Sequence, residues 1–237
     1  ETIGRVAAGA VASLILKELG ISICAYTKSI GPVSISMDRF QPELLGQTPT
    51  GMPDAESSAQ AEAYLEECMQ NHNSAGGVVE CVVDGVPAGI GEPVFDKLDA
   101  CLAKAIMSVG AVKAVEIGDG CSVSTAAGTE NNDAFYMENG QIAKKTNHAG
   151  GILGGISDGS RIVLRAHIKP TPSVFSEQET VNKNGEDILI HIKGRHDPVI
   201  VPRAVVVVES MTALTLVDLI FAGMPSRMDG IKKFYGK

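Results

Sequence analysis

The stretch Gly76–Gly120, "GGVVECVVDGVPAGIGEPVFDKLDACLAKAIMSVGAVKAVEIGDG", contains two apolar runs on either side of a periodic segment. The runs "GGVVECVVDG" and "AVKAVEIGDG" each end in a glycine turn, which is typical of strands. Between them, apolar residues recur three and four apart, which predicts a helix introduced by Pro93. The predicted apolar face of this helix comprises Val94, Leu98, Cys101, Leu102, Ala105 and Ile106. Strands next to long helices indicate a mixed α and β architecture of packed layers.

Three further segments have the signals of helices. The apolar residues of the first segment are spaced three and four apart, and Gly20 follows as a C-terminal stop. Asp54 stands where it can cap a helix that runs to about Asn71. The stretch "RAVVVVESMTALTLVDLIFAG" (Arg203–Gly223) begins with β-branched residues, but its length favours a buried helix.

Strands are predicted in three other places. "ISICAYTKSIGPVSIS" (Ile21–Ser36) is expected to be extended chain interrupted at Gly31-Pro32. "RIVLRAHI" (Arg161–Ile168) is expected to be a single strand. "VNKNGEDILIHIK" (Val181–Lys193) predicts a hairpin around Asn184-Gly185.

Length and composition indicate an ordinary soluble protein. With 237 residues, 44% of them hydrophobic, the chain is long enough for one large domain or two small ones. Its apolar runs are broken well short of the roughly 18 to 20 residues that a membrane span requires, and no secretion signal is predicted. Five widely spaced cysteines without a C-x-x-C pair argue against disulfides and a zinc site, and favour free thiols in a reducing cytoplasm.

The charge of the chain indicates the class of its ligand. A formal net charge of −8 argues against binding to nucleic acid, because such surfaces need clustered Lys and Arg. From Arg161 to Arg203, however, seven Lys or Arg outnumber five acidic residues, which gives a local charge of +2. A small anionic ligand fits that local excess better than a polymer does.

The stretch "NHAGGILGGISDG" (Asn147–Gly159) has five glycines in thirteen residues. It lacks the lysine that a P-loop needs, because Ile156 stands in that position, and it lacks the G-x-G-x-x-G order of dinucleotide-binding folds. Two interpretations remain open: a turn that joins two strands, or a loop whose bare backbone lies close to a ligand. The preceding segment, Cys121–Asn147, is polar, aperiodic and long, and is expected to be a functional lid or disordered.

The stretch "IKPTPS" ends a predicted strand with two prolines, which excludes a central strand. The ammonium of Lys169 and the amides and hydroxyls of Thr171 and Ser173 are therefore available to water or to a ligand.

The stretch "KGRHDP" (Lys193–Pro198) combines cations, a histidine and a carboxylate. If it is extended, Arg195 and Asp197 point to the same side and can line one pocket wall, while His196 faces away. The alternative for the pair is a surface salt bridge, which contributes little energy.

Taken together and in this order, these stretches resemble chorismate synthase. The resemblance extends from "ETIGRVAAGAVA" at the start, through Gly76–Gly120, the glycine stretch and "KPTPS", to "GRHDPVIVPRAVVVVE". It implies an α/β fold of the α+β type, a layered β-α-β sandwich with helices packed between mainly antiparallel sheets, in one domain over residues 1–237. The implied reaction is anti 1,4-elimination of phosphate from 5-enolpyruvylshikimate 3-phosphate to give chorismate, with reduced FMN as cofactor and no net redox change.

The resemblance also implies the residues of the site. Asp197 is implied as the catalytic residue that manages the flavin proton, and Arg195 as a contact of both substrate and FMN. A side chain at position 154 would displace the flavin ring system. No metal is implied. The other FMN contacts that carry over are Gly110, Ala111, Gly154, Lys169, Pro170, Thr171, Pro172 and Ser173.

The N-terminal third of the family has no counterpart in this sequence. That third contains two catalytic histidines, several substrate-binding arginines and part of the flavin site. The expectation is therefore an N-terminally truncated chain, incomplete for catalysis by itself. The alternative function is a non-catalytic module that keeps a flavin or phosphate pocket as a scaffold. We also expect the protein to be a homotetramer in the cytoplasm, with no nucleic-acid or membrane partner.

Overall fold

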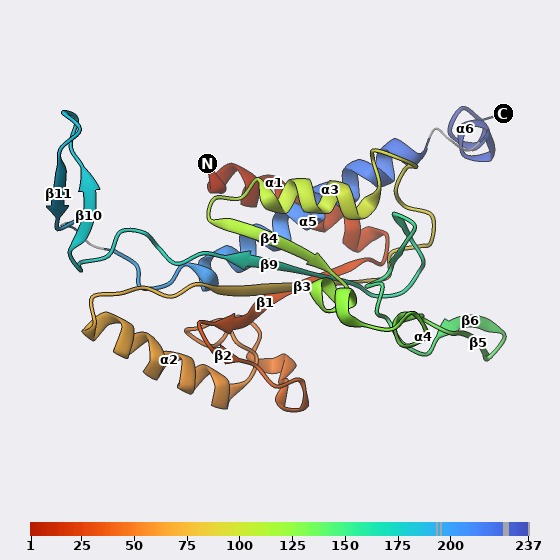
Figure 1. The fold of residues 1–237 in the computed structure, drawn as a ribbon. Helices are drawn as coiled ribbons and strands as arrows, with labels where there is room; N and C mark the ends of the chain where they lie inside the picture. Colours follow the sequence, from red (N-terminus) through yellow and green to blue (C-terminus); the bar gives the residue numbers. More distant parts are fainter. Residues whose placement is uncertain (193, 195, 225–227, 237) are drawn as a thin grey trace. The chain divides into compact units, whose positions relative to one another are not determined.

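The computed structural model describes residues 1–192, 194, 196–224 and 228–236 (Figure 1). The α-helices are α1 (Thr2–Glu18), α2 (Ala55–Gln70), α3 (Leu98–Met107), α4 (Gly128–Asn131), α5 (Val201–Gly223) and α6 (Met228–Phe234). The 3-10 helices are η1 (Met37–Arg39), η2 (Pro42–Leu44) and η3 (Gly120–Thr125). The strands are β1 (Ser22–Ile30), β2 (Val33–Ser34), β3 (Gly77–Asp84), β4 (Val112–Ile117), β5 (Phe135–Glu138), β6 (Gln141–Lys144), β7 (Ile152–Leu153), β8 (Ile156–Ser157), β9 (Ile162–Ile168), β10 (Gln178–Val181) and β11 (Asp187–Ile190).

The strands form one larger sheet and several hairpins. The five-stranded sheet has the order β2-β1-β3-β9-β4, and β1 pairs with β2 in antiparallel register, Ser29 opposite Ser34. The pairs β5–β6, β7–β8 and β10–β11 are antiparallel hairpins. The predicted turn at Asn184-Gly185 lies between β10 and β11. Helices combined with antiparallel sheet confirm the α+β class.

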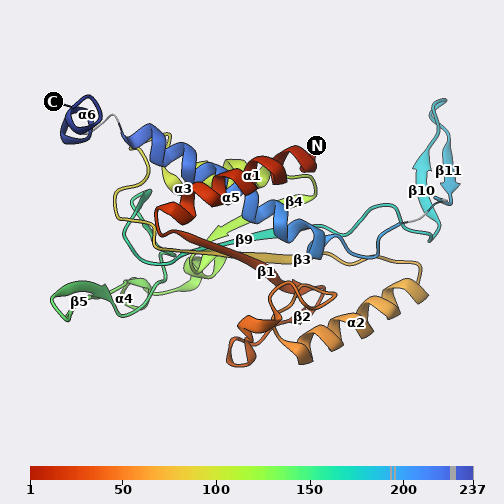
Figure 2. The ribbon, with the colours of Figure 1, turned by 180° about the vertical axis from the view of Figure 1, so that it is seen from behind.

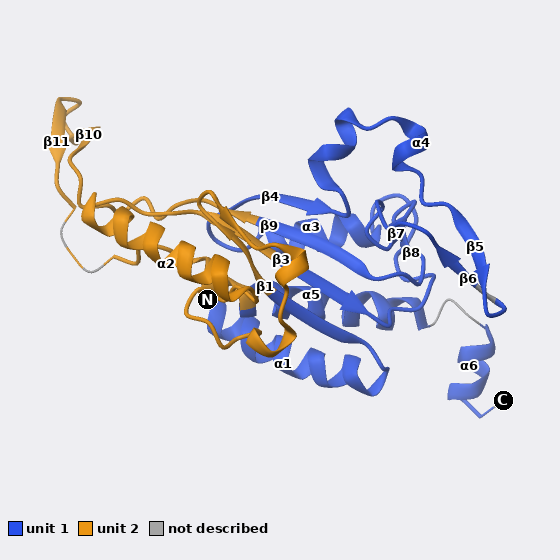
Figure 3. Cartoon of the chain, turned by 90° about the horizontal axis from the view of Figure 1, so that it is seen from below, with its two compact units in different colours: residues 1–25, 80–166, 206–237 blue, residues 26–79, 167–205 orange. Residues whose placement is uncertain are grey.

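The chain divides into two compact units (Figure 3). Unit 1 comprises residues 1–25, 80–166 and 206–237, and unit 2 comprises residues 26–79 and 167–205. The division passes through β1, β3, β9 and α5. That residues 1–237 form one domain stays a prediction.

In unit 1, α1, α3 and α5 lie along one face of β3, β9 and β4 (Figures 1 and 2). α1 packs closely on α5 because Gly9 has no side chain: a Cβ there would lie 2.2 Å from the Cβ of Ser210. Burial alternates along β9, so every second side chain enters the core. Each large apolar side chain contributes roughly 1.5–3 kcal/mol on burial. The fully buried residues here include Leu98, Leu102, Ile106, Ile162, Leu164, Val208 and Leu216.

The predicted start of the third helix at Pro93 is wrong. α3 begins at Leu98, and Val94 is 70% exposed with a φ of +73°. The preceding residues form a tight turn in which the amide of Phe95 donates to the carbonyl of Pro93 at 3.1 Å. The amide of Leu98 donates to the carbonyl of Gly155 at 2.7 Å, so the glycine stretch caps a helix that has no side-chain cap.

In unit 2, Asp54 caps α2 as predicted. Its carboxylate accepts hydrogen bonds from the amides of Glu56 and Ser57 at the start of α2. It also accepts from the amide of Ser36 at 3.0 Å and from Arg39. Burial alone would raise the pKa of Asp54, but these hydrogen bonds hold it far below its usual range. Asp54 therefore ties the end of β2 to the start of α2.

α5 confirms the predicted helix over Arg203–Gly223. By length and composition alone this helix could cross a membrane, but the core helix of a soluble protein passes the same test. Val208, Ala213 and Leu216 have no exposed surface. These three residues place one side of α5 in the core of unit 1.

The segment 121–147 contains more regular structure than predicted. Most of η3, the short helix α4 and the hairpin β5–β6 all lie within it. β5 is exposed along its whole length, as expected of an edge hairpin.

Candidate functional site

The glycine stretch forms the short hairpin β7–β8, with Gly154 and Gly155 in its turn. The first interpretation of this stretch, a turn between two strands, is confirmed. Tight packing explains two of its glycines. A Cβ on Gly150 would lie 2.3 Å from the amide nitrogen of Gly118, and one on Gly151 would lie 2.6 Å from a neighbouring backbone oxygen.

Gly154 differs from these neighbours. Its φ is +63°, but nothing lies within 4 Å of its Cβ position. Leu153 beside it is 56% exposed, so the tip of the hairpin is open. Gly155, in contrast, has no room for a Cβ, which would lie 2.4 Å from the side chain of Lys97. No packing contact among the described residues therefore requires a glycine at position 154. Only its positive φ favours glycine there.

Gly110 and Ala111 follow α3 in the turn that leads to β4. Ala111 has a φ of +71°, which costs a non-glycine residue about 1 kcal/mol or more and is most frequent at functional sites. The ten residues of α3 lie between this turn and the Gly155 carbonyl that caps its start, a separation of about 15 Å along the helix axis. The structure therefore does not bring Gly110 and Ala111 next to Gly154.

The segment Lys169–Ser173 follows β9 and lies in unit 2. Lys169 is exposed and has no ion pair with the described residues. The carbonyl of Thr171 accepts from the hydroxyl of Ser74 at 2.7 Å, whereas the hydroxyl of Thr171 is buried without a hydrogen-bond partner in the described chain. Because buried polar atoms are rarely unpaired, this hydroxyl marks a place where water or a ligand binds.

A pocket of about 380 Å³ in unit 2 brings Ser173 and Asp197 together. Phe175 also lines it, with edge-to-face ring contacts to His72 at 6.2 Å and to His196 at 5.2 Å between centroids. The Nε2 atom of His196 is buried without a partner among the described residues. Residues with an aromatic ring, a hydroxyl, a carboxylate and an imidazole therefore line one pocket.

The structure changes the interpretation of "KGRHDP". Asp197 pairs with Arg203 at 2.5 Å, and the two side chains are 34% and 71% exposed. Arg195 lies outside the described residues, so its predicted pairing with Asp197 is not tested. The expectation that His196 faces away from Asp197 is wrong, because β11 ends at Ile190 and both residues line the same pocket. Strand alternation does not apply to irregular chain.

The model of the chorismate synthase family matches residues 1–221. This chain belongs to the chorismate synthase family. It is 63% identical over 238 residues to the chorismate synthase of Lachnoclostridium phytofermentans and 60% identical over 237 residues to that of Lachnospira eligens. Each alignment covers 100% of this chain and 65% of the relative, so the chain spans about two thirds of the length of these relatives. A crystal structure of chorismate synthase is similar with a TM-score of 0.79 at 29% identity, covering 100% of this chain and 68% of that one.

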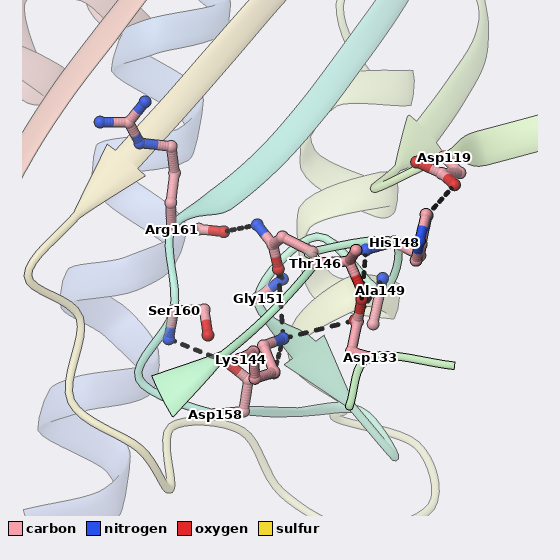
Figure 4. Close-up of polar contacts among 11 residues, drawn as sticks. Asp119, Asp133, Lys144, Thr146, His148, Ala149, Gly151, Asp158, Ser160 and Arg161 are labelled. Carbon is pink, nitrogen blue, oxygen red and sulfur yellow. Dashed lines mark hydrogen bonds and ion pairs between the residues drawn. The ribbon is translucent and has the colours of Figure 1, made fainter. Parts of the chain in front are cut away.

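Sequence reasoning missed a buried charge cluster in this chorismate synthase family member (Figure 4). The ammonium of Lys144 lies 2.7 Å from the carboxylate of Asp158 and 3.5 Å from that of Asp133. All three side chains are at most 10% exposed. Lys144 and Asp133 come from the aperiodic segment 121–147, where no pattern distinguished them from solvated polar residues.

Asp133 is the most heavily bonded member of this cluster. It accepts from the amides of His148 at 2.7 Å and Ala149 at 3.0 Å, and from the hydroxyl of Thr146 at 2.7 Å. Burial alone would raise the pKa of Asp133, but these bonds and the charge of Lys144 lower it to about 2. Asp133 is therefore ionised wherever the protein is folded near neutral pH.

A second group of charges lies behind the glycine stretch. Arg165 of β9 donates to Glu80 at 3.1 Å, to Glu116 at 2.9 Å and to the carbonyl of Gly118. The sequence gives no signal for it, because an Arg in a strand is usually exposed. Arg165 fixes the turn at Gly118 on which Gly150 packs.

Proposed function

We propose that this chain provides chorismate synthase activity, the conversion of 5-enolpyruvylshikimate 3-phosphate to chorismate with reduced FMN. The observation that carries the proposal is the family match over residues 1–221. The named relatives, which span more sequence than this chain, support it. The same names support a lyase of aromatic biosynthesis, and we propose that it acts on a carbon–oxygen bond.

The proposed reaction breaks two bonds and forms one C=C bond in net. The C–O bond to phosphate breaks and phosphate leaves with its electron pair, while a ring C–H bond breaks and the hydrogen leaves as a proton. Reduced FMN, when bound, lends electron density to the breaking C–O bond and is not consumed. In this reaction, the residues of this chain bind the anionic substrate and cofactor, orient them and hold a proton acceptor in place.

Three described features of the chain fit contacts to FMN. Gly154 has open space where any other residue would have a side chain. Lys169 has an exposed ammonium without an ion pair among the described residues, as a phosphate-binding lysine needs. The buried hydroxyl of Thr171 needs a partner, and a flavin oxygen would provide one. Pro170, Pro172, Ser173, Gly110, Ala111 and Arg195 complete the proposed contacts.

Asp197 is the proposed proton acceptor. Asp197 lines the same pocket as Ser173, and its ion pair with Arg203 holds one carboxylate oxygen at 2.5 Å. A carboxylate held in this way can accept a proton at its second oxygen without leaving the pocket wall. Arg195, two residues before it, is the proposed contact of substrate and flavin phosphates.

An anaerobic assay on the complete protein tests the proposed function. With reduced FMN saturating, we expect equal amounts of phosphate and chorismate from 5-enolpyruvylshikimate 3-phosphate. Oxidised FMN is the matched control and should give no product. Absence of both products with reduced FMN would contradict the proposal.

The second candidate is a non-catalytic scaffold that binds flavin or phosphate. The exposed ammonium of Lys169, without an ion pair among the described residues, fits this candidate as well, because phosphate binding alone needs such a group. The mass of the intact natural polypeptide discriminates between the two. A mass near 24.7 kDa supports the scaffold, and a substantially larger one supports the enzyme. A cytoplasmic homotetramer is our proposal for the assembled protein.

A further inference from the structure

We propose that Asp133, Lys144 and Asp158 form a clamp that sets the conformation of the glycine hairpin, and that Lys144 is a positioning residue for the flavin. The inference rests on the proposed function, because it takes Gly154 as a flavin contact. It gives the segment 121–147 a role beyond that of a lid. Figure 4 shows the clamp at the base of the glycine stretch.

Asp133 holds the start of the glycine stretch. Its two carboxylate oxygens accept separately from the consecutive amides of His148 and Ala149, at 2.7 and 3.0 Å. Because two consecutive amides point at one carboxylate, the backbone has little freedom to rotate there. The direction in which the chain enters the hairpin β7–β8 is thereby fixed.

Asp158 holds the end of the stretch. Its carboxylate accepts from the amide of Ser160 at 2.8 Å, and its own amide donates to the carbonyl of Gly151 at 3.0 Å. Asp158 follows β8 directly, so it fixes the direction in which the chain leaves the hairpin.

Lys144 contacts both carboxylates and also Asn147, and so joins the two ends of the glycine stretch. Its ammonium donates to Asp158, to Asp133 and to the side-chain oxygen of Asn147, at 2.7, 3.5 and 3.2 Å. The same oxygen of Asn147 accepts from the amide of Gly151 at 2.9 Å. The ammonium of Lys144 therefore contacts Asn147 at the start and Asp158 at the end of the loop that carries Gly154, and Asn147 connects it to Gly151 in the interior.

The charges of the clamp explain why Lys144 is needed. Both carboxylates have at most 10% of their side chains exposed, and Lys144 is the cation that contacts both of them in the described chain. Without it, two buried negative charges would lie side by side with little screening. They would move apart, and the two ends of the hairpin would move with them. A shift of about 1 Å at Gly154 is sufficient to weaken a flavin contact.

Lys144→Met in the complete protein tests the proposal, and Lys145→Met is the matched control. Methionine keeps most of the side-chain volume without the charge, and Lys145 is the exposed neighbour. We expect Lys144→Met to raise the dissociation constant of FMN about tenfold or more. Lys145→Met should change it by less than about twofold. Equal affinity in the two variants would overturn the proposal.

A second variant separates positioning from general damage to the fold. In Lys144→Met/Asp158→Asn, the cluster keeps its net charge, because one cation and one anion are removed together. We expect FMN affinity between those of the single variant and the unchanged protein. A double variant that folds but binds no better than Lys144→Met overturns the charge argument. If only the double variant folds, binding equal to that of the unchanged protein overturns the proposal.

Amide exchange distinguishes failure of this inference from failure of the proposed function. If the unchanged protein binds no FMN, the proposed function fails, but the clamp remains testable without flavin. We expect the amides of Ala149 and Gly151 to lose protection in Lys144→Met and to keep it in Lys145→Met. Unchanged protection of both amides in Lys144→Met overturns the clamp itself.

Discussion

Gly154 and Gly185 have similar backbone conformations and different proposed roles. Both lie in hairpin turns, with φ values of +63° and +82°, and neither has an atom within 4 Å of its Cβ position. Alanine should therefore cost each position about 1 kcal/mol of unfolding free energy through backbone strain alone. We expect only Gly154→Ala to weaken FMN binding, because only there would the new methyl group meet the flavin.

Flavin fluorescence titration and thermal unfolding of both variants measure these two effects separately. Gly185→Ala serves as the control for strain. Equal FMN affinity in Gly154→Ala and Gly185→Ala would remove Gly154 from the flavin site.

Asp197 should be distinguishable from an ordinary exposed acid. Asp197→Asn keeps the shape of the side chain but removes a negative charge and a proton acceptor, so ligands should bind as well or better. Turnover should fall about a hundredfold or more. Asp187→Asn, an exposed acid of β11, is the control and should leave turnover unchanged. Steady-state rates of phosphate release with reduced FMN provide the measurement. Near-normal turnover in Asp197→Asn would contradict the proton role.

Asp133 should make the protein lose stability in acid. Its pKa is lowered to about 2 in the folded state, below that of an unfolded aspartate near 4. The lowered pKa contributes about 2 kcal/mol of stability above pH 4, which is lost as the pH falls towards 2. Asp133→Asn should unfold at lower denaturant concentration at pH 7 and lose less stability between pH 5 and pH 3. An identical pH dependence of unfolding in both proteins would show that Asp133 is not the titrating group.

Single residues could be predicted where one local rule decides. Asp54 was recognised as a helix cap because a cap needs only an acid just before a periodic segment. Lys144 could not be recognised, because its partner Asp158 is fourteen residues away and only the fold brings the two together. Buried ion pairs between distant residues leave no periodic pattern in the sequence.

At the scale of elements, prediction succeeded where the periodic pattern was long. β9 alternates buried and half-buried residues over its whole length, and α5 is too long and apolar for a strand. The predicted start of α3 at Pro93 is too early. Proline is a frequent first residue of helices, but here the chain makes one more turn before α3 begins at Leu98. The sequence does not predict β5 and β6, because strands of four residues are too short to show a readable alternation.

The segment 121–147 should respond to flavin as a lid would. Its hairpin β5–β6 is exposed on β5 and joined to the rest of the segment by short turns. We expect its amides to exchange fast without ligand and more slowly with FMN bound. The amides of His148 and Ala149, which donate to Asp133, should be protected in both states. If FMN leaves the hydrogen exchange of the β5–β6 amides unchanged, the proposed lid role of this segment is contradicted.

At the scale of the whole molecule, the residues proposed as flavin contacts are distributed over two units, each of which is described by itself. Gly154, Gly110 and Ala111 belong to unit 1, whereas Lys169–Ser173 and Asp197 belong to unit 2. The family resemblance identified these positions in the sequence, but local patterns alone gave no reason to group them. Ser173 and Asp197 line the same pocket in unit 2, and the flavin contacts of all these residues are proposals that ligand binding has to test.

The central claim is that this chain carries a flavin site used together with an anionic substrate. Titration of the complete protein with FMN, with and without 5-enolpyruvylshikimate 3-phosphate, tests it most directly. We expect saturable quenching of flavin fluorescence and a lower dissociation constant when the substrate is present, because bound FMN and substrate are in direct contact in the proposed reaction. Absence of FMN binding both with and without the substrate would contradict the account.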